Sequence, residues 1–168
     1  MPKLKKQEVE FTIKGMILDP VNNSPVVILQ DTDDTTILPI WIGVFEANAI
    51  ALELEHIETP RPMTHDLIRA LLRQLSAAME KIVVTDLVDS TYFAEIHLQH
   101  HGETVVVDSR PSDALAVAIR MGARIFVNEE VIRKSRSFSI ADRENWTEDD
   151  LKKWLENAAP EDLGKYKM

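Results

Sequence analysis

Three short segments of the sequence carry polar side chains of the types that act on phosphate esters. Each segment follows an apolar stretch and leads into a predicted helix. The unpaired backbone N–H groups at the start of a helix, together with the helix dipole, favour bound anions, including phosphate. The segments are Leu38–Gly43 with Glu46 behind it, Pro60–Asp66 and Asp108–Asp113. If they converge, they bring together a histidine, several carboxylates and arginines, which is the equipment for phosphodiester chemistry.

Each candidate side chain has a role in such a reaction. His65 is the candidate general base or acid, because histidine changes charge near neutral pH. Carboxylates hold Mg²⁺ or Mn²⁺, which activates water and stabilises charge on the phosphate, and guanidinium groups match phosphate oxygens bidentately. We predict the catalytic residues Glu46, His65, Asp66, Asp108 and Asp113, the metal ligands Asp66, Asp108 and Asp113, and the phosphate-binding residues Arg61, Arg110, Ser112 and Arg120.

The same residues also have a purely structural interpretation. Asp66 and Asp113 fall in first helical turns, where a carboxylate satisfies free N–H groups, and Thr64 is a candidate N-cap. Arg110 can form an ion pair with Asp108 or Asp113. The sequence leaves capping and ion pairing open beside the catalytic interpretation.

The elements that must position these side chains alternate between strand and helix patterns. Apolar residues at every second position predict strands, and spacings of three and four predict helices. Pro111 starts the last long helix and holds Arg110 extended, and Gly122 ends that helix. The strands are expected over residues 9–18, 26–29, 37–42, 81–87, 92–98, 104–107 and 124–127, and the helices over 47–58, 64–75, 114–121 and 129–134. This order predicts an α+β fold, a mixed sheet with helices packed on it.

Composition limits the classes of protein that remain. The 168 residues are 45% hydrophobic and 28% charged, which excludes wholesale disorder, and the lack of cysteine excludes disulfide scaffolds and thiol nucleophiles. The 28 acidic and 19 basic residues give a net charge of -9, which argues against non-specific coating of nucleic acid but allows a local basic patch. Because no apolar run resembles a signal peptide or a membrane span, we expect a cytoplasmic protein without a membrane partner.

The chain changes composition near Ser137. Residues 7–136 are predicted to form the folded domain, and residues 137–168, with 8 acids and 5 bases, an acidic C-terminal helical tail. Trp146 and Trp154 are expected to dock this tail. Trp41, between Ile40 and Ile42, is expected in the core, with base stacking as the alternative.

The three polar segments resemble the bifunctional nuclease family. The resemblance is carried by LPIWIG at residues 38–43 with Glu46 and Ala47–Ile50 behind it, by PRPMTHDL at residues 60–67, and by DSRPSDALAVAIR at residues 108–120. It covers about residues 7–136, in the family's order. It implies a compact α+β domain, a homo-oligomer and a nuclease that acts on RNA and DNA. It supplies no set of catalytic residues, so the site residues named above rest on their own chemistry.

Two functional hypotheses follow, with a third that is structural. The first is a nuclease that hydrolyses phosphodiester bonds of RNA or DNA. The second is a non-enzymatic regulatory module that binds an anion, a nucleotide or a partner with the same arginines and helix ends. In the third, the three segments form a subunit interface with buried Arg–Asp pairs. A nuclease assay with and without EDTA separates the first hypothesis from the others.

Overall fold

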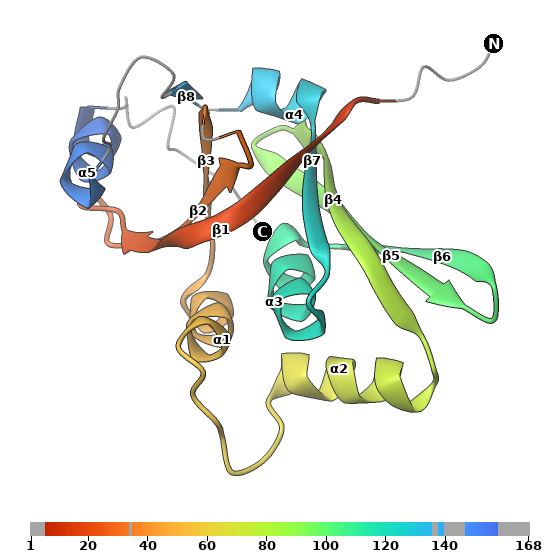
Figure 1. Ribbon diagram of the computed structural model, residues 1–168. Coiled ribbons are helices and arrows are strands. Elements are labelled where there is room, and N and C mark those ends of the chain that lie inside the picture. The colour runs from red at the N-terminus through yellow and green to blue at the C-terminus, as the bar shows by residue number, and fades with distance from the viewer. Residues whose placement is uncertain (1–5, 34, 136–137, 140–146, 158–168) are drawn as a thin grey trace.

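Strands separated by turn-forming residues build one mixed sheet in the computed structural model, which describes residues 6–33, 35–135, 138–139 and 147–157 (Figure 1). The strands in these ranges are β1 (Glu8–Leu18), β2 (Pro25–Asp31), β3 (Thr36–Trp41), β4 (Ala78–Val88), β5 (Thr91–His100), β6 (Glu103–Ser109), β7 (Arg124–Asn128) and β8 (Phe138–Ser139). Their order across the sheet is β6-β5-β4-β7-β1-β2-β3-β8. Only β4 and β7 pair in parallel among these strands; the other neighbours are antiparallel.

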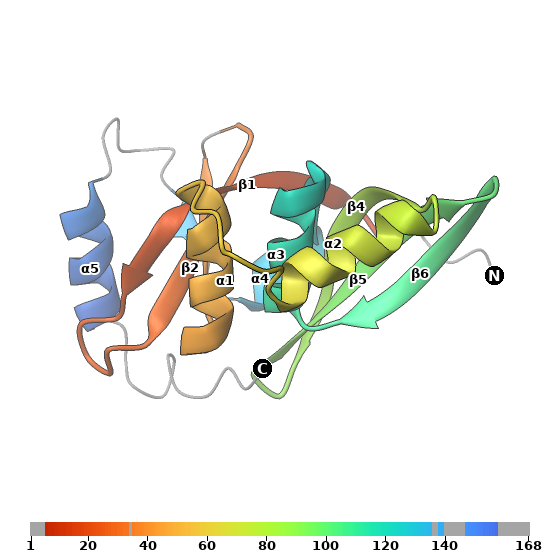
Figure 2. The ribbon, with the colours of Figure 1, turned by 90° about the horizontal axis from the view of Figure 1, so that it is seen from below.

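Three helices, α1 (Val44–Leu54), α2 (Thr64–Gln74) and α3 (Pro111–Met121), lie on one side of this sheet (Figures 1 and 2). The other helices of the described ranges are α4 (Glu129–Lys134) and α5 (Glu148–Asn157). Helix α3 contacts both α1 and α2. It begins at Pro111, as predicted, and ends at Gly122, whose φ of 67° lies in the left-handed region that glycine adopts without strain. The α+β prediction is confirmed.

Strands β2 and β3 are buried on both faces. The side chains of a strand alternate between faces, so Val27 and Leu29 join the main core while Val26 and Ile28 point to the opposite side. On that side they form a second core with Trp41 and with Leu151 and Leu155 of α5. Trp41 is 5% exposed and its Nε1 donates a hydrogen bond to Asp19 Oδ2 at 2.9 Å, so the core interpretation of Trp41 is confirmed.

The predicted tail therefore contains a helix that covers part of the sheet. Trp154 packs at the edge of the second core, in line with the expected docking of the tail, whereas Trp146 lies outside the described residues. The division of the chain into residues 7–136 and 137–168 stays a prediction. In the part of the chain described, no helix combines the length and the apolar character needed to cross a membrane.

Helix α2 shows one difference from the sequence analysis at its start. Thr64 is its first helical residue rather than its N-cap; Met63 holds the N-cap position, and its N–H donates to Asp66 Oδ2 at 3.0 Å. The capping role of Asp66 is confirmed. The helix therefore starts one residue earlier than an N-cap at Thr64 predicts, because Asp66, at the third helical position, accepts the hydrogen bond from the N–H of the N-cap residue Met63.

Candidate functional site

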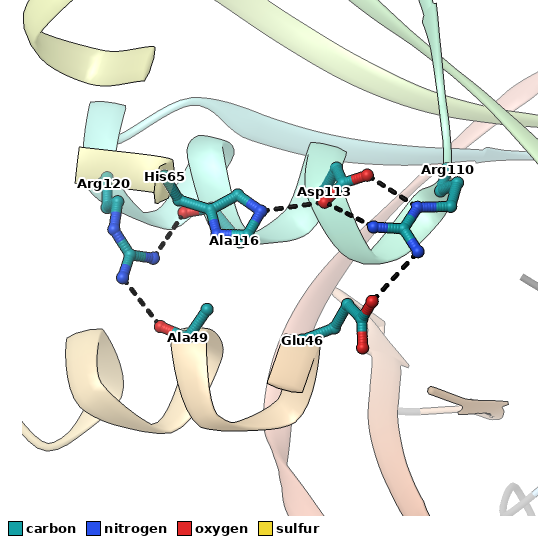
Figure 3. A network of polar contacts seen from close by, with 7 residues as sticks. All are labelled: Glu46, Ala49, His65, Arg110, Asp113, Ala116 and Arg120. Carbon is teal, nitrogen blue, oxygen red and sulfur yellow. Dashed lines mark hydrogen bonds and ion pairs between the residues drawn. The ribbon is translucent and has the colours of Figure 1, made fainter. Parts of the chain in front are cut away.

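Four polar side chains from the N-terminal ends of three helices form one hydrogen-bonded network (Figure 3). His65 Nε2 lies 2.8 Å from Asp113 Oδ1. Arg110 donates to both oxygens of Asp113, from Nε at 2.8 Å and from Nη2 at 3.1 Å. Its Nη1 donates to Glu46 Oε1 at 3.0 Å. All three polar segments of the sequence therefore meet here.

Local structure aims these side chains at one another. Arg110 is the N-cap of α3 with φ −70° and ψ 146°, the extended conformation that a following proline favours. Gly43 is the N-cap of α1, and a Cβ at this position would collide with the carboxylate of Glu46. The absence of a side chain at Gly43 lets Glu46 fold over the helix start and reach Arg110.

The network fixes the charge states of two members. Burial alone would raise the pKa of the Asp113 carboxyl, but hydrogen bonds from Arg110 and His65 outweigh burial and lower it. The pKa of Arg110 is raised, chiefly by its hydrogen bonds to Asp113 and, against the effect of burial, further by Glu46. Asp113 is therefore ionised, and His65 Nε2 must carry the proton that it donates to Asp113.

A second cluster lies one residue along α2. Asp66 Oδ1 accepts a hydrogen bond from Arg120 Nε at 2.8 Å. The other two nitrogens of Arg120 donate to the carbonyl oxygens of Ala116 and Ala49, both at 2.8 Å, which ties α3 to α1 (Figure 3). The hydrogen bond from Arg120 lowers the pKa of Asp66; burial opposes this effect, and the Met63 N–H assists it. Because the Arg120 side chain is 1% exposed and its three nitrogens are engaged, it holds the fold together in this structure.

The remaining predicted site residues lie apart from the network. Asp108 is exposed on β6 opposite Glu95 of β5, and its side chain forms no hydrogen bond or ion pair with another residue of the described ranges. Ser112 is fully buried, and its Oγ has no partner among the described atoms. Arg61 is exposed in the loop before α2. The structure thus brings together Glu46, His65, Arg110 and Asp113, with Asp66 and Arg120 beside them.

The three predicted metal ligands do not form a metal site in this arrangement. Asp66 and Asp113 are bonded to different arginines, and Asp108 contacts neither carboxylate. In the described part of the chain, no three histidine, aspartate or glutamate side chains gather as metal ligands do. The residues therefore do not fit Mg²⁺ or Mn²⁺ as predicted.

A cleft of about 610 Å³ opens beside the second cluster. Its walls are the C-terminal half of α1, the loop that follows it and one face of α2, and Arg120 lies at its base. Four of the seven arginines in the described ranges line this cleft, together with three carboxylates: Arg61, Arg69, Arg73 and Arg120, with Glu53, Glu58 and Asp66. We call this feature the arginine cleft. Glu46, His65, Arg110 and Asp113 do not line it.

Arg69, Arg73 and His56 line the cleft but are not among the site residues predicted from the sequence. The available signal is the helical spacing of Asp66, Arg69 and Arg73, which places these three charged side chains on one face of α2. The prediction of this helix rests instead on its leucines, which lie on other faces. His56 offers no such signal. It lies just after α1 with a φ of 54°, and its position depends on the path of the chain after that helix.

Comparison with known protein families identifies the family of this chain. Residues 27–139 match the family described as "Bifunctional nuclease domain". This match covers more than half of the chain and includes the residues of the network. The chain belongs to the bifunctional nuclease domain family.

Similar proteins occur in bacteria and plants. An uncharacterized protein of Mycobacterium tuberculosis is 35% identical over 163 residues, which cover 92% of this chain and 97% of that protein. The protein named bifunctional nuclease 1 of Arabidopsis thaliana is 28% identical over 109 residues, 62% of this chain and 34% of the plant protein. Bifunctional nuclease 1 of Oryza sativa subsp. japonica is 24% identical over 116 residues, 67% of this chain and 35% of the plant protein. This chain thus corresponds to about a third of each plant nuclease.

Proposed function

We propose that this protein is a nuclease that hydrolyses phosphodiester bonds of RNA or DNA. Membership of the bifunctional nuclease domain family and the names of its plant relatives support this proposal. The observation that carries it is the link from His65 through Asp113 to Arg110, in which one arginine orients the acid that orients the histidine. The histidine, the carboxylate and the arginine are the groups that phosphodiester hydrolysis uses.

His65 has the role of proton-transfer group. Asp113 is ionised and accepts the Nε2 proton, so the lone pair of the imidazole is on Nδ1. Nδ1 takes a proton from the attacking water, or from the 2′-hydroxyl when the substrate is RNA, as that oxygen bonds to phosphorus. The phosphorus–oxygen bond to the leaving nucleotide then breaks, and the leaving oxygen takes a proton from solvent. Asp113 stabilises the positive charge that then forms on the ring. A proton-transfer group of this kind typically contributes about 10²–10⁴-fold to the rate.

Arg110 has the role of phosphate-binding group. Its three hydrogen bonds to Asp113 and Glu46 use three of the five N–H donors of a guanidinium. The side chain is 45% exposed, so the other two donors can reach a phosphate oxygen beside His65. Glu46 and Asp113 hold the guanidinium in place, which lowers the entropy lost when phosphate binds.

The test compares His65→Gln and Asp113→Asn with the wild type, using RNA and DNA substrates with Mg²⁺, Mn²⁺ or EDTA. His97→Gln is the matched control, because His97 Nε2 also pairs with a carboxylate, Glu95, at 3.2 Å, but outside the network. We expect turnover to fall at least about a hundredfold in the first two variants and to be unchanged in the control. Equal activity in all four preparations would identify a contaminating nuclease and reject the proposal.

A second candidate function is a regulatory module that binds a phosphorylated ligand without turnover. The observation that favours it is the burial of His65, which is 8% exposed within a network whose charges are all paired. A wild-type protein that binds oligonucleotide but hydrolyses none under every metal condition would establish this second function.

We further propose that the protein is a homo-oligomer. Leu67, Leu71 and the C-cap residue Leu75 lie one turn apart along α2 and are between 52% and 63% exposed. They form an apolar ridge along one side of this helix. A ridge of this kind is typical of a surface that another subunit covers.

A further inference from the structure

We propose that the arginine cleft is where a single nucleic-acid strand binds through its phosphate groups, next to the His65 network. The inference rests on the proposed nuclease function for the identity of the ligand. It assigns a binding role to Arg61, Arg69 and Arg73 as a group, whose side chains line the cleft along one face of α2 and in the preceding loop.

The guanidinium groups of Arg61, Arg69 and Arg73 make few contacts within the fold. Arg61 and Arg73 are exposed and form no side-chain hydrogen bond or ion pair with any residue of the described ranges. Arg69 reaches Asp66 only at 4.0 Å, at the limit of an ion pair, while Arg120 already holds that carboxylate at 2.8 Å. The three guanidinium groups therefore keep nearly all of their donors for a ligand.

Arg69 and Arg73 also carry like charges at a spacing that disfavours a helix. Arg69 and Arg73 are four residues apart on one helix face, and like charges at this spacing repel each other. Arg61 lines the same cleft from the loop, whereas the charge of Arg120 is compensated by Asp66. An anionic ligand removes this repulsion, which the protein alone leaves in place.

The charge of the cleft differs in sign from the net charge of the chain. The chain carries a net charge of -9, yet the cleft holds four arginines against Glu53, Glu58 and Asp66. Asp66 is neutralised by Arg120, and Glu53 and Glu58 stand at the α1 side and in the loop. A positive cleft on an acidic surface concentrates phosphates at one place and repels them elsewhere.

Size and position select a single strand. A volume of about 610 Å³ lies within the range of about 300–1,000 Å³ that small-ligand sites occupy, which accommodates a nucleotide unit and not a duplex. Asp66 lines the cleft, and His65 precedes it in the chain, so their Cα atoms are about 3.8 Å apart. In the proposed complex, a strand with one phosphate at Arg110 and His65 extends along α2 into the cleft.

The experiment measures binding apart from hydrolysis. Every protein carries His65→Gln, and EDTA is present, so no strand is cut. The probes are a short fluorescent single-stranded oligonucleotide, read by anisotropy, and inorganic pyrophosphate, read by calorimetry. The test variant is Arg61→Gln/Arg73→Gln. The matched control is Arg124→Gln/Arg133→Gln, which removes two arginines that are also exposed but lie outside the cleft.

We expect the test variant to bind the oligonucleotide at least tenfold more weakly than its parent, with no change in the control. The slope of log affinity against log salt should fall by about 1.4, since each phosphate contact to a single strand contributes about 0.7. Equal affinity of the test variant and its parent would overturn the proposal, and so would binding of pyrophosphate without binding of the strand.

Failure of the cleft and failure of the nuclease proposal are distinguishable. If binding depends on Arg61 and Arg73 but the protein with His65 intact hydrolyses nothing, the cleft stands and the nuclease function fails. If that protein hydrolyses strands at an unchanged rate, and with an unchanged KM, after Arg61→Gln/Arg73→Gln, the nuclease function stands and the cleft assignment is wrong.

Discussion

The guanidinium of Arg120 is almost completely buried, and Asp66 is the carboxylate that neutralises it, with Nε and Oδ1 at 2.8 Å. Removing one partner of a buried pair leaves the other charge without compensation, which costs about 3–5 kcal/mol. Because Asp66 itself is 19% exposed, we expect Asp66→Ala to lower the free energy of unfolding by about 3 kcal/mol, near the lower end of this range. Urea unfolding at neutral pH measures it.

The control for this prediction is Asp66→Ala/Arg120→Met, which removes both charges and keeps an apolar side chain of similar length. We expect the double variant to recover part of the lost stability. A single variant as stable as the wild type would show that water reaches Arg120 and that the pair contributes little.

Acid sensitivity follows from the lowered pKa values of Asp66 and Asp113. A carboxyl whose pKa is lower in the folded state stabilises the fold fully above its unfolded value of about 4, and this stability disappears as the pH falls toward the folded value. We expect unfolding free energy to drop below about pH 4 in the wild type and to drop less steeply in Asp113→Asn. Urea titrations between neutral and acidic pH provide the measurement, and parallel curves would contradict the assignment.

The sequence predicted the elements because its local signals agree with the fold. Pro111 and Gly122 bound the predicted last long helix and bound α3 in the structure. The leucines of α2 gave the right helix but not its buried face: Ile68 and Leu72 pack against the core, whereas Leu67 and Leu71 are exposed. Spacing alone cannot rank two apolar faces of one helix, since their burial depends on how α2 sits against α3.

The candidate site was predictable as a set of segments but not as a set of contacts. Strand and helix periods place Asp108 and Arg110 near one another in the chain, yet only Arg110 joins the network. Asp108 lies within β6, where pairing with β5 fixes its direction, while Arg110 is the first residue free of the sheet. The bond from His65 to Asp113 spans 48 positions and depends on the packing of α2 against α3.

The second core makes the tail a contributor to stability. Leu155 of α5 is fully buried against the face of β2 and β3 that carries Trp41. We expect Leu155→Ala to lower the free energy of unfolding by about 3 kcal/mol, the usual cost of a Leu→Ala cavity. In a background without Trp146 and Trp154, the fluorescence of Trp41 should also shift to longer wavelength. An unchanged melt and spectrum would mean that α5 does not cover this face in solution.

The leucine ridge on α2 gives a test of the proposed homo-oligomer. We expect the wild type to show an oligomeric mass by light scattering and Leu71→Glu to show the mass of one chain. Leu71 is 53% exposed and glutamate is a good helix former, so the substitution should leave the fold of the monomer intact. Lys14→Glu, on β1, is a control for the added negative charge. A wild type that is monomeric at high concentration would reject the proposal.

Arg110→Lys separates the chemical role of the network from its structural role. Lysine keeps the charge but lacks the planar fork that binds both oxygens of Asp113 while reaching Glu46. Because the Arg110 side chain is 45% exposed, its ion pairs contribute at most about 1 kcal/mol to stability, so the thermal midpoint should barely move. Turnover should fall at least about tenfold, equivalent to about 1.4 kcal/mol, because both the phosphate contact and the orientation of Asp113 are lost. If the variant instead melts earlier or changes its oligomeric mass, with unchanged activity per folded protein, Arg110 stabilises the fold or a subunit interface. The proposed role of Arg110 in orienting Asp113, the partner of His65, is then wrong.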